Sequence, residues 1–150
     1  MTASDTVPNA DIYKAINHAE LFAGIGAPEQ HALASKLSII HSNANEIIIE
    51  QGDVSDSLYM IFKGYVSVYI KRTDGWVRIN RLGPGDVFGE IGVLRKIRRT
   101  ARIVTEGPCV FFSINSTDFL DIYQHFPARA RDNIQIIIAK RMAHQSHSTD

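Results

Sequence analysis

One short stretch of the chain carries most of the residue types that could bind an anion. Gly89 and Gly92 let the backbone approach a ligand closely, and a helical turn starting near Glu90 would aim free N–H groups at it. Arg99 can hold a phosphate with two hydrogen bonds, and Thr100 adds a hydroxyl. When ionised, Glu90 can accept hydrogen bonds but cannot donate them, so it suits a sugar hydroxyl and would repel a phosphate. The stretch therefore predicts a site for a phosphate that is joined to a sugar.

The spacing of these residues follows a recognisable pattern. The sequence reads Phe88-Gly-Glu-Ile-Gly-Val-Leu94, then a loop at 95–98, then Arg99-Thr-Ala101. It resembles the phosphate-binding cassette of the cyclic-nucleotide-binding domain family, which includes catabolite activator proteins, protein kinase A regulatory subunits and cyclic-nucleotide-gated channels. The resemblance implies non-covalent binding of cyclic AMP, or of cyclic GMP, with no catalytic residue, cofactor or metal. The implied ligand-binding residues are Gly89, Glu90, Ile91, Gly92, Arg99, Thr100 and Ala101.

The loop at 95–98 departs from the family pattern. It reads Arg95-Lys96-Ile97-Arg98, where many members place glycine and proline. Its charge would strengthen anion capture or contact a protein partner, or the loop is merely exposed. Two simpler alternatives concern the site itself: Arg99 belongs to a solvated basic loop, and Glu90 pairs with a neighbouring arginine.

Length and composition indicate one ordinary globular domain. The chain has 150 residues, 45% of them hydrophobic, and its 16 basic and 16 acidic residues cancel. This balance gives no sign of a nucleic-acid or membrane partner. Cys109 is the single cysteine and is expected to be a small core residue. No apolar run reaches the length of a membrane span and no signal peptide is recognisable, so a cytoplasmic location is expected.

The elements around the cassette predict a mainly β fold with flanking helices. Residues 1–8 are expected to be disordered, and two short helices are expected between residue 9 and Leu37. Short strands rich in β-branched and aromatic residues follow, separated by turn signals, and predict a jelly-roll (double-stranded β-helix) barrel over about residues 38–115. Within it, the alternation at 66–71 predicts one buried and one more polar face. Together, these elements and the helices that follow them predict one cyclic-nucleotide-binding domain over residues 9–146.

Two helices are expected after the barrel, over about residues 116–145. Ser116 is the predicted cap of the first, and Pro127 begins the second. On the second helix, one apolar stripe would pack on the barrel, and a second stripe would remain for a lid contact, a homodimer or an effector protein. Lys140 and Arg141 lie where some relatives cap the base, and the tail from His144 is expected to be loose. The stripes are Ala130, Ile134, Ile137, Ile138 and Met142, and then Ile136, Ala139 and Ala143.

Three functions compete on sequence grounds. The first is a sensor module whose C-terminal helix closes over a bound cyclic nucleotide. The second is a protein-interaction module of the same fold that has lost nucleotide binding. The third is a metal-dependent enzyme of the cupin type, which is disfavoured because the six histidines are scattered. No helix-turn-helix follows the last helix, so direct DNA binding is not expected.

Overall fold

The computed structural model describes residues 7–147, with side chains to residue 145. Eight antiparallel strands form two sheets, as a mainly β jelly roll predicts. One sheet has the order β1 (Ser38–Ser42), β8 (Cys109–Asn115), β3 (Ser57–Lys63) and β6 (Val87–Phe88). The other has the order β2 (Ile47–Ile49), β7 (Arg102–Thr105), β4 (Val66–Arg72) and β5 (Gly75–Leu82).

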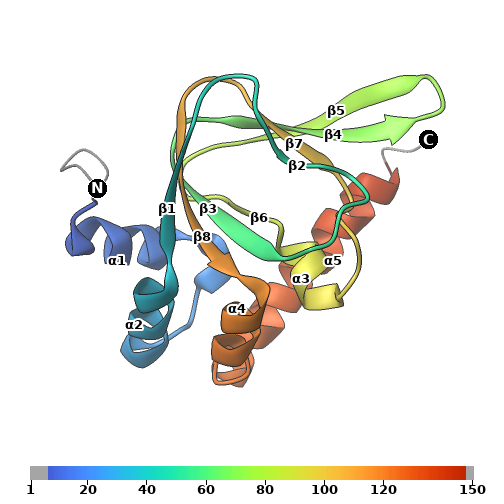
Figure 1. The fold of residues 1–150 in the computed structure, drawn as a ribbon. Helices are drawn as coiled ribbons and strands as arrows, with labels where there is room; N and C mark the ends of the chain where they lie inside the picture. Colours follow the sequence, from blue (N-terminus) through green and yellow to red (C-terminus); the bar gives the residue numbers. More distant parts are fainter. Residues whose placement is uncertain (1–6, 148–150) are drawn as a thin grey trace.

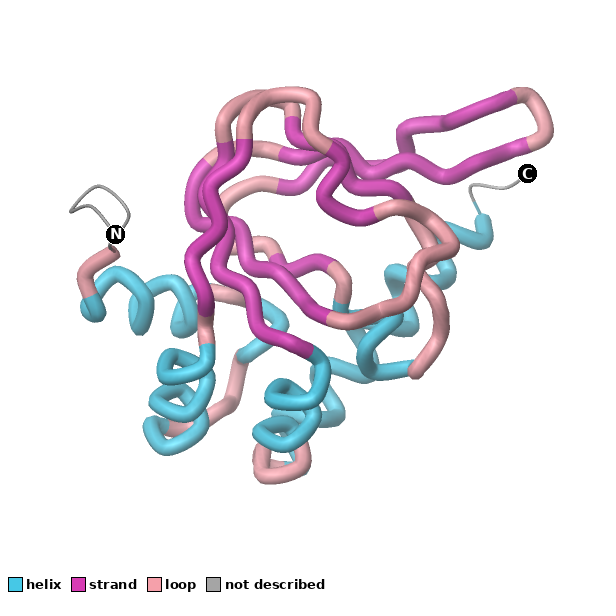
Figure 2. Tube along the Cα trace, viewed as in Figure 1, coloured by secondary structure: helices cyan, strands magenta, loops and turns pink. Residues whose placement is uncertain are grey.

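Helices flank the strands on one side (Figure 1, Figure 2). Before the barrel come α1 (Asn9–His18), the 3-10 turn η2 (Glu20–Phe22) and α2 (Ala27–Lys36); within and after it come α3 (Glu90–Arg95), α4 (Ser116–Tyr123) and α5 (Ala128–His147). The hairpin of β4 and β5 projects beyond the barrel, and α5 runs past α3 towards it (Figure 1). Among the described residues, no helix is long and apolar enough to cross a membrane.

Two apolar clusters hold the fold together. One fills the space between the sheets, where Ile61, Val66 and Phe111 are almost fully buried. The other joins the outer face of the first sheet to the helices, through Phe112 and Phe119 among others. Cys109 belongs to the inner cluster, and burial raises the pKa of its thiol. The sheet that carries β3 and β8 is therefore apolar on both faces.

Three local expectations are corrected. The cap of α4 is Asn115, whose side chain accepts a hydrogen bond from the N–H of Asp118, and not Ser116. Strand β6 was not predicted, because two residues carry no alternation to detect. Ser67 was expected on the polar face of β4 but is 4% exposed, since its hydroxyl donates to the carboxylate of Glu106.

The C-terminal helix packs with one stripe, as expected. Ala130, Ile134 and Ile138 are fully buried against the helical cluster. The second stripe is open: Ile136 is 55% exposed, and Ala139 and Ala143 are exposed as well. The helix is longer than expected and includes His144, so the prediction of a loose tail from that residue was wrong. The tail residues 148–150 and the N-terminal residues 1–6, predicted to be disordered, lie outside the described residues.

The two stripes of α5 give a test of its packing. We expect Ile138→Ala to lower the free energy of unfolding by about 2–5 kcal/mol, because it leaves a cavity at a fully buried position. Ile136→Ala, on the exposed stripe of the same helix, should change it by less than about 0.5 kcal/mol. Urea unfolding followed by circular dichroism measures both. Equal losses would show that α5 does not pack as described.

Candidate functional site

A cavity of about 210 Å³ lies between the second sheet, α3 and the end of α5. Its sheet wall comes from β4, β5 and β7 and is mostly apolar, with one polar residue, Asn80, beside Val68, Ile79, Leu82 and Ile103. All seven residues that the sequence indicated line it: Gly89, Glu90, Ile91, Gly92, Arg99, Thr100 and Ala101. The structure thus brings the whole predicted set together in one pocket.

The guanidinium of Arg99 is anchored inside this cavity. Its Nη1 donates to the carbonyl of Gly89 at 3.0 Å, and its Nη2 donates to the carbonyl of Ser57 at 2.6 Å. Asp56 lies 3.4 Å from Nη2. The Nε–H has no hydrogen-bond partner among the described residues. The side chain is therefore fixed in place while part of its donor capacity stays available.

Burial of Arg99 favours the binding of an anion beside its guanidinium. Arg99 is 6% exposed, and desolvation lowers the pKa of its guanidinium, with Tyr59 and Asp56 partly opposing the shift. The Asp56 side chain is 80% exposed, so water screens its charge. The buried carboxylate of Glu90 also opposes the shift, but among the described residues the ion-pair partner of Arg99 is the exposed Asp56, so much of the cost of burying the cation remains. An anionic group in the cavity would offset that cost.

Glu90 is the second buried charge of the cavity. It is 2% exposed, and one carboxylate oxygen, Oε1, pairs with Arg141 from α5. The other oxygen, Oε2, is buried and has no hydrogen-bond partner within the part of the chain that the structure describes. Because an unpartnered buried carboxylate oxygen costs free energy, this atom offers a place for a donor from a ligand.

The two glycines of the cassette are required for different reasons. Gly89 has φ +86°, and a Cβ there would lie 2.8 Å from Nη1 of Arg99. Gly92 has ordinary helical backbone, but a Cβ there would lie 1.9 Å from Oγ of Ser55. Glycine is thus required at 89 by the left-handed backbone before α3 and by the close approach of the Arg99 guanidinium. The need for glycine at 92 comes from packing against Ser55.

The end of α5 forms the far wall of the cavity. Lys140, Arg141, His144 and Gln145 line it. Arg141 also donates to the carbonyl of Val87 at 2.7 Å, and a ring nitrogen of His144 lies 3.0 Å from the carbonyl of Ile79. Of the sequence alternatives, Glu90 does pair with an arginine, but one that is 51 residues away and not a neighbour.

Sequence reasoning missed several of these residues. Asp56 and Ser57, which hold Arg99, lie 43 and 42 residues before it. No local spacing connects them to Arg99. The wall residues of β4, β5 and β7 read only as strand residues. His144 was assigned to the tail, although the apolar spacing of α5 extends to Ala143 and could have included it.

Residues 7–147 contain no group of three or more histidine, cysteine, aspartate or glutamate side chains that could hold a metal ion. The lining of the cavity supplies one carboxylate and one imidazole, from Glu90 and His144.

The jelly roll thus holds an anchored arginine and a buried carboxylate in one pocket, an arrangement that suits a small ligand with an anion and a hydroxyl. The family model described as the cyclic nucleotide-binding domain matches residues 39–126. This match covers more than half of the chain, and the chain belongs to that family. It is a regulatory domain of the cyclic-nucleotide-binding type, similar to those of protein kinase A regulatory subunits.

Curated relatives and solved structures agree with this assignment. The chain is 33% identical over 111 residues to the cAMP-dependent protein kinase regulatory subunit of Yarrowia lipolytica, which is 74% of this chain and 28% of that protein. It is 32% identical over 107 residues to the type II regulatory subunit of Drosophila melanogaster, 71% of this chain and 27% of that protein. The chain thus spans about a quarter of the length of these relatives.

Three solved structures share the fold. The regulatory domain of Toxoplasma gondii protein kinase A with cAMP has a TM-score of 0.74 at 19% identity, over 76% of this chain and 44% of that one. A regulatory subunit of a cAMP-independent protein kinase A from Trypanosoma cruzi, bound to guanosine, has a TM-score of 0.73 at 24% identity, over 78% of this chain and 42% of that one. Thermus thermophilus catabolite activator protein has a TM-score of 0.74 at 25% identity, over 86% of this chain and 61% of that one.

Two glycines with the same backbone conformation test how the cavity is built. Gly89→Ala and Gly52→Ala both place a side chain at positive φ, +86° and +93°, which should cost about 1–2 kcal/mol of unfolding free energy. At Gly52 nothing lies within 4 Å of the new Cβ, whereas at Gly89 it meets the Arg99 guanidinium. We expect a further loss of about 1–3 kcal/mol for Gly89→Ala. Chemical denaturation measures both, and equal losses would contradict the close contact.

Proposed function

We propose that this chain binds a 3′,5′-cyclic nucleotide in the cavity, with cyclic AMP as the first candidate and cyclic GMP as the second. The observation that carries the proposal is a pair of buried, opposite charges in one pocket, each with an unused hydrogen-bonding atom. Within the described residues, the Nε–H donor of Arg99 and the Oε2 acceptor of Glu90 have no hydrogen-bond partner. A ligand that carries both an anion and a hydroxyl would satisfy both groups at once.

The phosphate binds at the arginine in this proposal. A cyclic phosphodiester carries one negative charge, which matches the single buried guanidinium of Arg99. The first residues of α3, Glu90, Ile91 and Gly92, line the same pocket, and their N–H groups, which have no partner within the helix, would add donors. The hydroxyl of Thr100 lies in the lining as well. Because Arg99 is already anchored, little side-chain entropy is lost on binding.

The ribose binds at Glu90. A 3′,5′-cyclic nucleotide has one free ribose hydroxyl, the 2′-OH, because the other two are esterified. This hydroxyl would donate to Oε2 of Glu90, while Oε1 stays paired with Arg141. A hydrogen bond to a charged acceptor contributes about 1.5–3 kcal/mol.

The base occupies the remaining space between the sheet wall and the end of α5. That wall offers apolar surface from Val68 and Ile79 and polar groups from Lys140 and Gln145. The Toxoplasma relative was crystallised with cAMP and the Trypanosoma relative with guanosine. Both are purine compounds, which supports a purine here without selecting one.

The signal is a change in the position of α5. Arg141 connects this helix to the cassette through Glu90 and the carbonyl of Val87. A ligand that engages Glu90 and the α5 wall together would favour the closed arrangement, which is a population shift. The exposed stripe around Ile136 would then serve a second copy or an effector, as in a sensor domain spanning about residues 9–146 of a cytoplasmic protein.

Adjacent arginines test the phosphate site. Arg99→Ala should weaken cyclic AMP binding by about 2–5 kcal/mol, the range for losing one partner of a buried hydrogen-bonded charge pair. Arg98→Ala removes an exposed arginine that does not line the cavity and should leave the affinity unchanged. Isothermal titration calorimetry compares the two. Unchanged affinity in the Arg99 variant would refute the site.

A combination of ligand and protein changes tests the ribose contact. The wild-type chain should bind 2′-deoxy-cyclic AMP at least about tenfold more weakly than cyclic AMP, because one charged hydrogen bond is lost. In Glu90→Gln this penalty should shrink, since the weaker acceptor gains less from the hydroxyl. Glu106→Gln, which changes a glutamate outside the cavity, should keep the full penalty. The same penalty in all three proteins would exclude Glu90 as the ribose contact.

The second candidate function is an interaction module that no longer binds nucleotide. The partly filled acceptor set of Glu90, which Arg141 already pairs, is the observation in its favour. Thermal unfolding with and without cyclic AMP and cyclic GMP separates the two. A rise in melting temperature with either ligand supports the sensor, because only a ligand of the native state stabilises it. No shift with either at millimolar concentration supports the interaction module.

A further inference from the structure

A second hollow of the surface lies on another side of the cassette and shares only Gly92 with the lining of the cavity. Val54 is 65% exposed and Ile97 is 41% exposed, and both line one groove. Val93 and Leu120 lie in the same groove, with Ser55 and Ser116 beside them. We call this surface, with Lys96 and Arg98 from the same lining, the Val54–Ile97 patch. Two large apolar side chains thus stand exposed in one hollow of the surface.

The patch is built on two loops that are bonded to each other. The N–H of Gly52 donates to the carbonyl of Arg99 at 2.9 Å, and the N–H of Arg99 donates to the carbonyl of Asp53 at 2.8 Å. The hydroxyl of Ser55 donates to the carbonyl of Ile97 at 2.7 Å. This set of bonds holds the loop at 50–57 against the loop at 96–99. The exposed apolar side chains are therefore held on a fixed backbone, which lowers the entropy lost when a partner binds.

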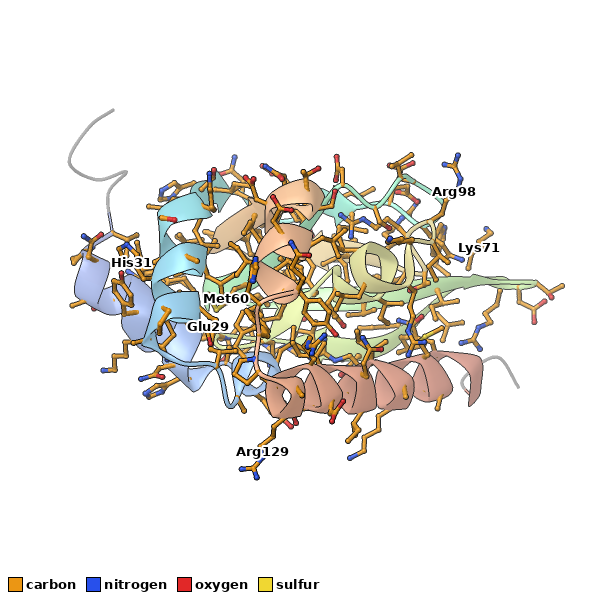
Figure 3. The ribbon with its side chains drawn as sticks, turned by 90° about the horizontal axis from the view of Figure 1, so that it is seen from below. Glu29, His31, Met60, Lys71, Arg98 and Arg129 are labelled. Carbon is orange, nitrogen blue, oxygen red and sulfur yellow. The ribbon has the colours of Figure 1, made fainter. Side chains whose placement is uncertain are left out.

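The side chains that line the patch carry positive charge only, whereas its surroundings carry both signs. Its lining contains Lys96 and Arg98 and no aspartate or glutamate. Arg95 is exposed at the end of α3 just before them. Figure 3 shows Arg98 directed outward, on the side of the molecule opposite α5. Asp53 and Asp56 lie in the neighbouring loop, but Asp56 faces Arg99.

We propose that the Val54–Ile97 patch docks an acidic protein segment that carries an apolar side chain. The apolar residue would cover Val54 and Ile97, and its acidic neighbours would pair with Lys96 and Arg98. Exposed apolar anchors with a charged rim are the usual composition of an interaction site. The two basic side chains of the lining, Lys96 and Arg98, favour an acidic partner over a second copy of this chain, because the same charges on both copies would repel. The proposal does not depend on nucleotide binding.

A labelled peptide of two leucines flanked on both sides by glutamates provides the probe. We expect the full chain to bind it, measured by fluorescence anisotropy at low salt, with backbone NMR shifts at Val54, Val93 and Ile97. The double variant Val54→Ser/Ile97→Ser should weaken binding at least about tenfold. Ile136→Ser, which removes another exposed isoleucine, should leave it unchanged. Arg98→Glu reverses one charge and should weaken peptide binding relative to the wild-type chain. The difference between the two proteins should grow as salt is lowered.

Several results would overturn the proposal. The first is no binding of the acidic peptide, and the second is equal binding of a peptide with lysines in place of the glutamates. The third is unchanged binding in the double variant. Sedimentation that shows self-association of the wild-type chain, abolished in the same variant, would assign the patch to a second copy instead. Urea unfolding of each variant confirms that a loss of binding is not a loss of fold.

Discussion

The buried guanidinium of Arg99 is the constraint on which the rest of the site depends. It is desolvated, and two backbone carbonyls hold it in one orientation. Those carbonyls come from β3 and from the left-handed residue before α3, so the barrel and the cassette must both be in place to hold it. Gly89 cannot carry a side chain without displacing this arginine. The fold thus accepts the cost of a buried cation at the place where an anion would stabilise it.

Glu90 extends the same logic to α5. Arg141 on the last helix pairs with one oxygen of its carboxylate. The other oxygen has no hydrogen-bond partner among the described residues. The cassette is therefore in contact with α5 before any ligand is considered. A hydroxyl added at Oε2 would complete the hydrogen bonding of a buried carboxylate and strengthen the wall that α5 provides. In our proposal, a ligand bound at Glu90 would thereby act on α5, a 20-residue helix that carries exposed apolar residues such as Ile136.

The sequence predicted the local parts of this arrangement well. Strand-rich patterning, the two stripes of α5 and the clustering of Gly89, Glu90 and Arg99 all follow from short-range spacing. The missing parts are long-range. Ser57 reaches Arg99 only because β3 passes beside the cassette, and Arg141 reaches Glu90 only because α5 folds back across the chain. Gly92 shows the same limit, since its packing against Ser55 cannot be read from neighbouring residues.

The chain belongs to the cyclic nucleotide-binding domain family, and binding of cyclic AMP in the cavity is the central claim of our account. A crystal structure of the chain grown with cyclic AMP tests it most directly. Our account predicts the nucleotide in the cavity, with its phosphate on Arg99 and its 2′-hydroxyl on Oε2 of Glu90. A cavity without nucleotide at millimolar cyclic AMP, with Arg99 still directed at its carbonyls and Glu90 paired only with Arg141, would contradict it.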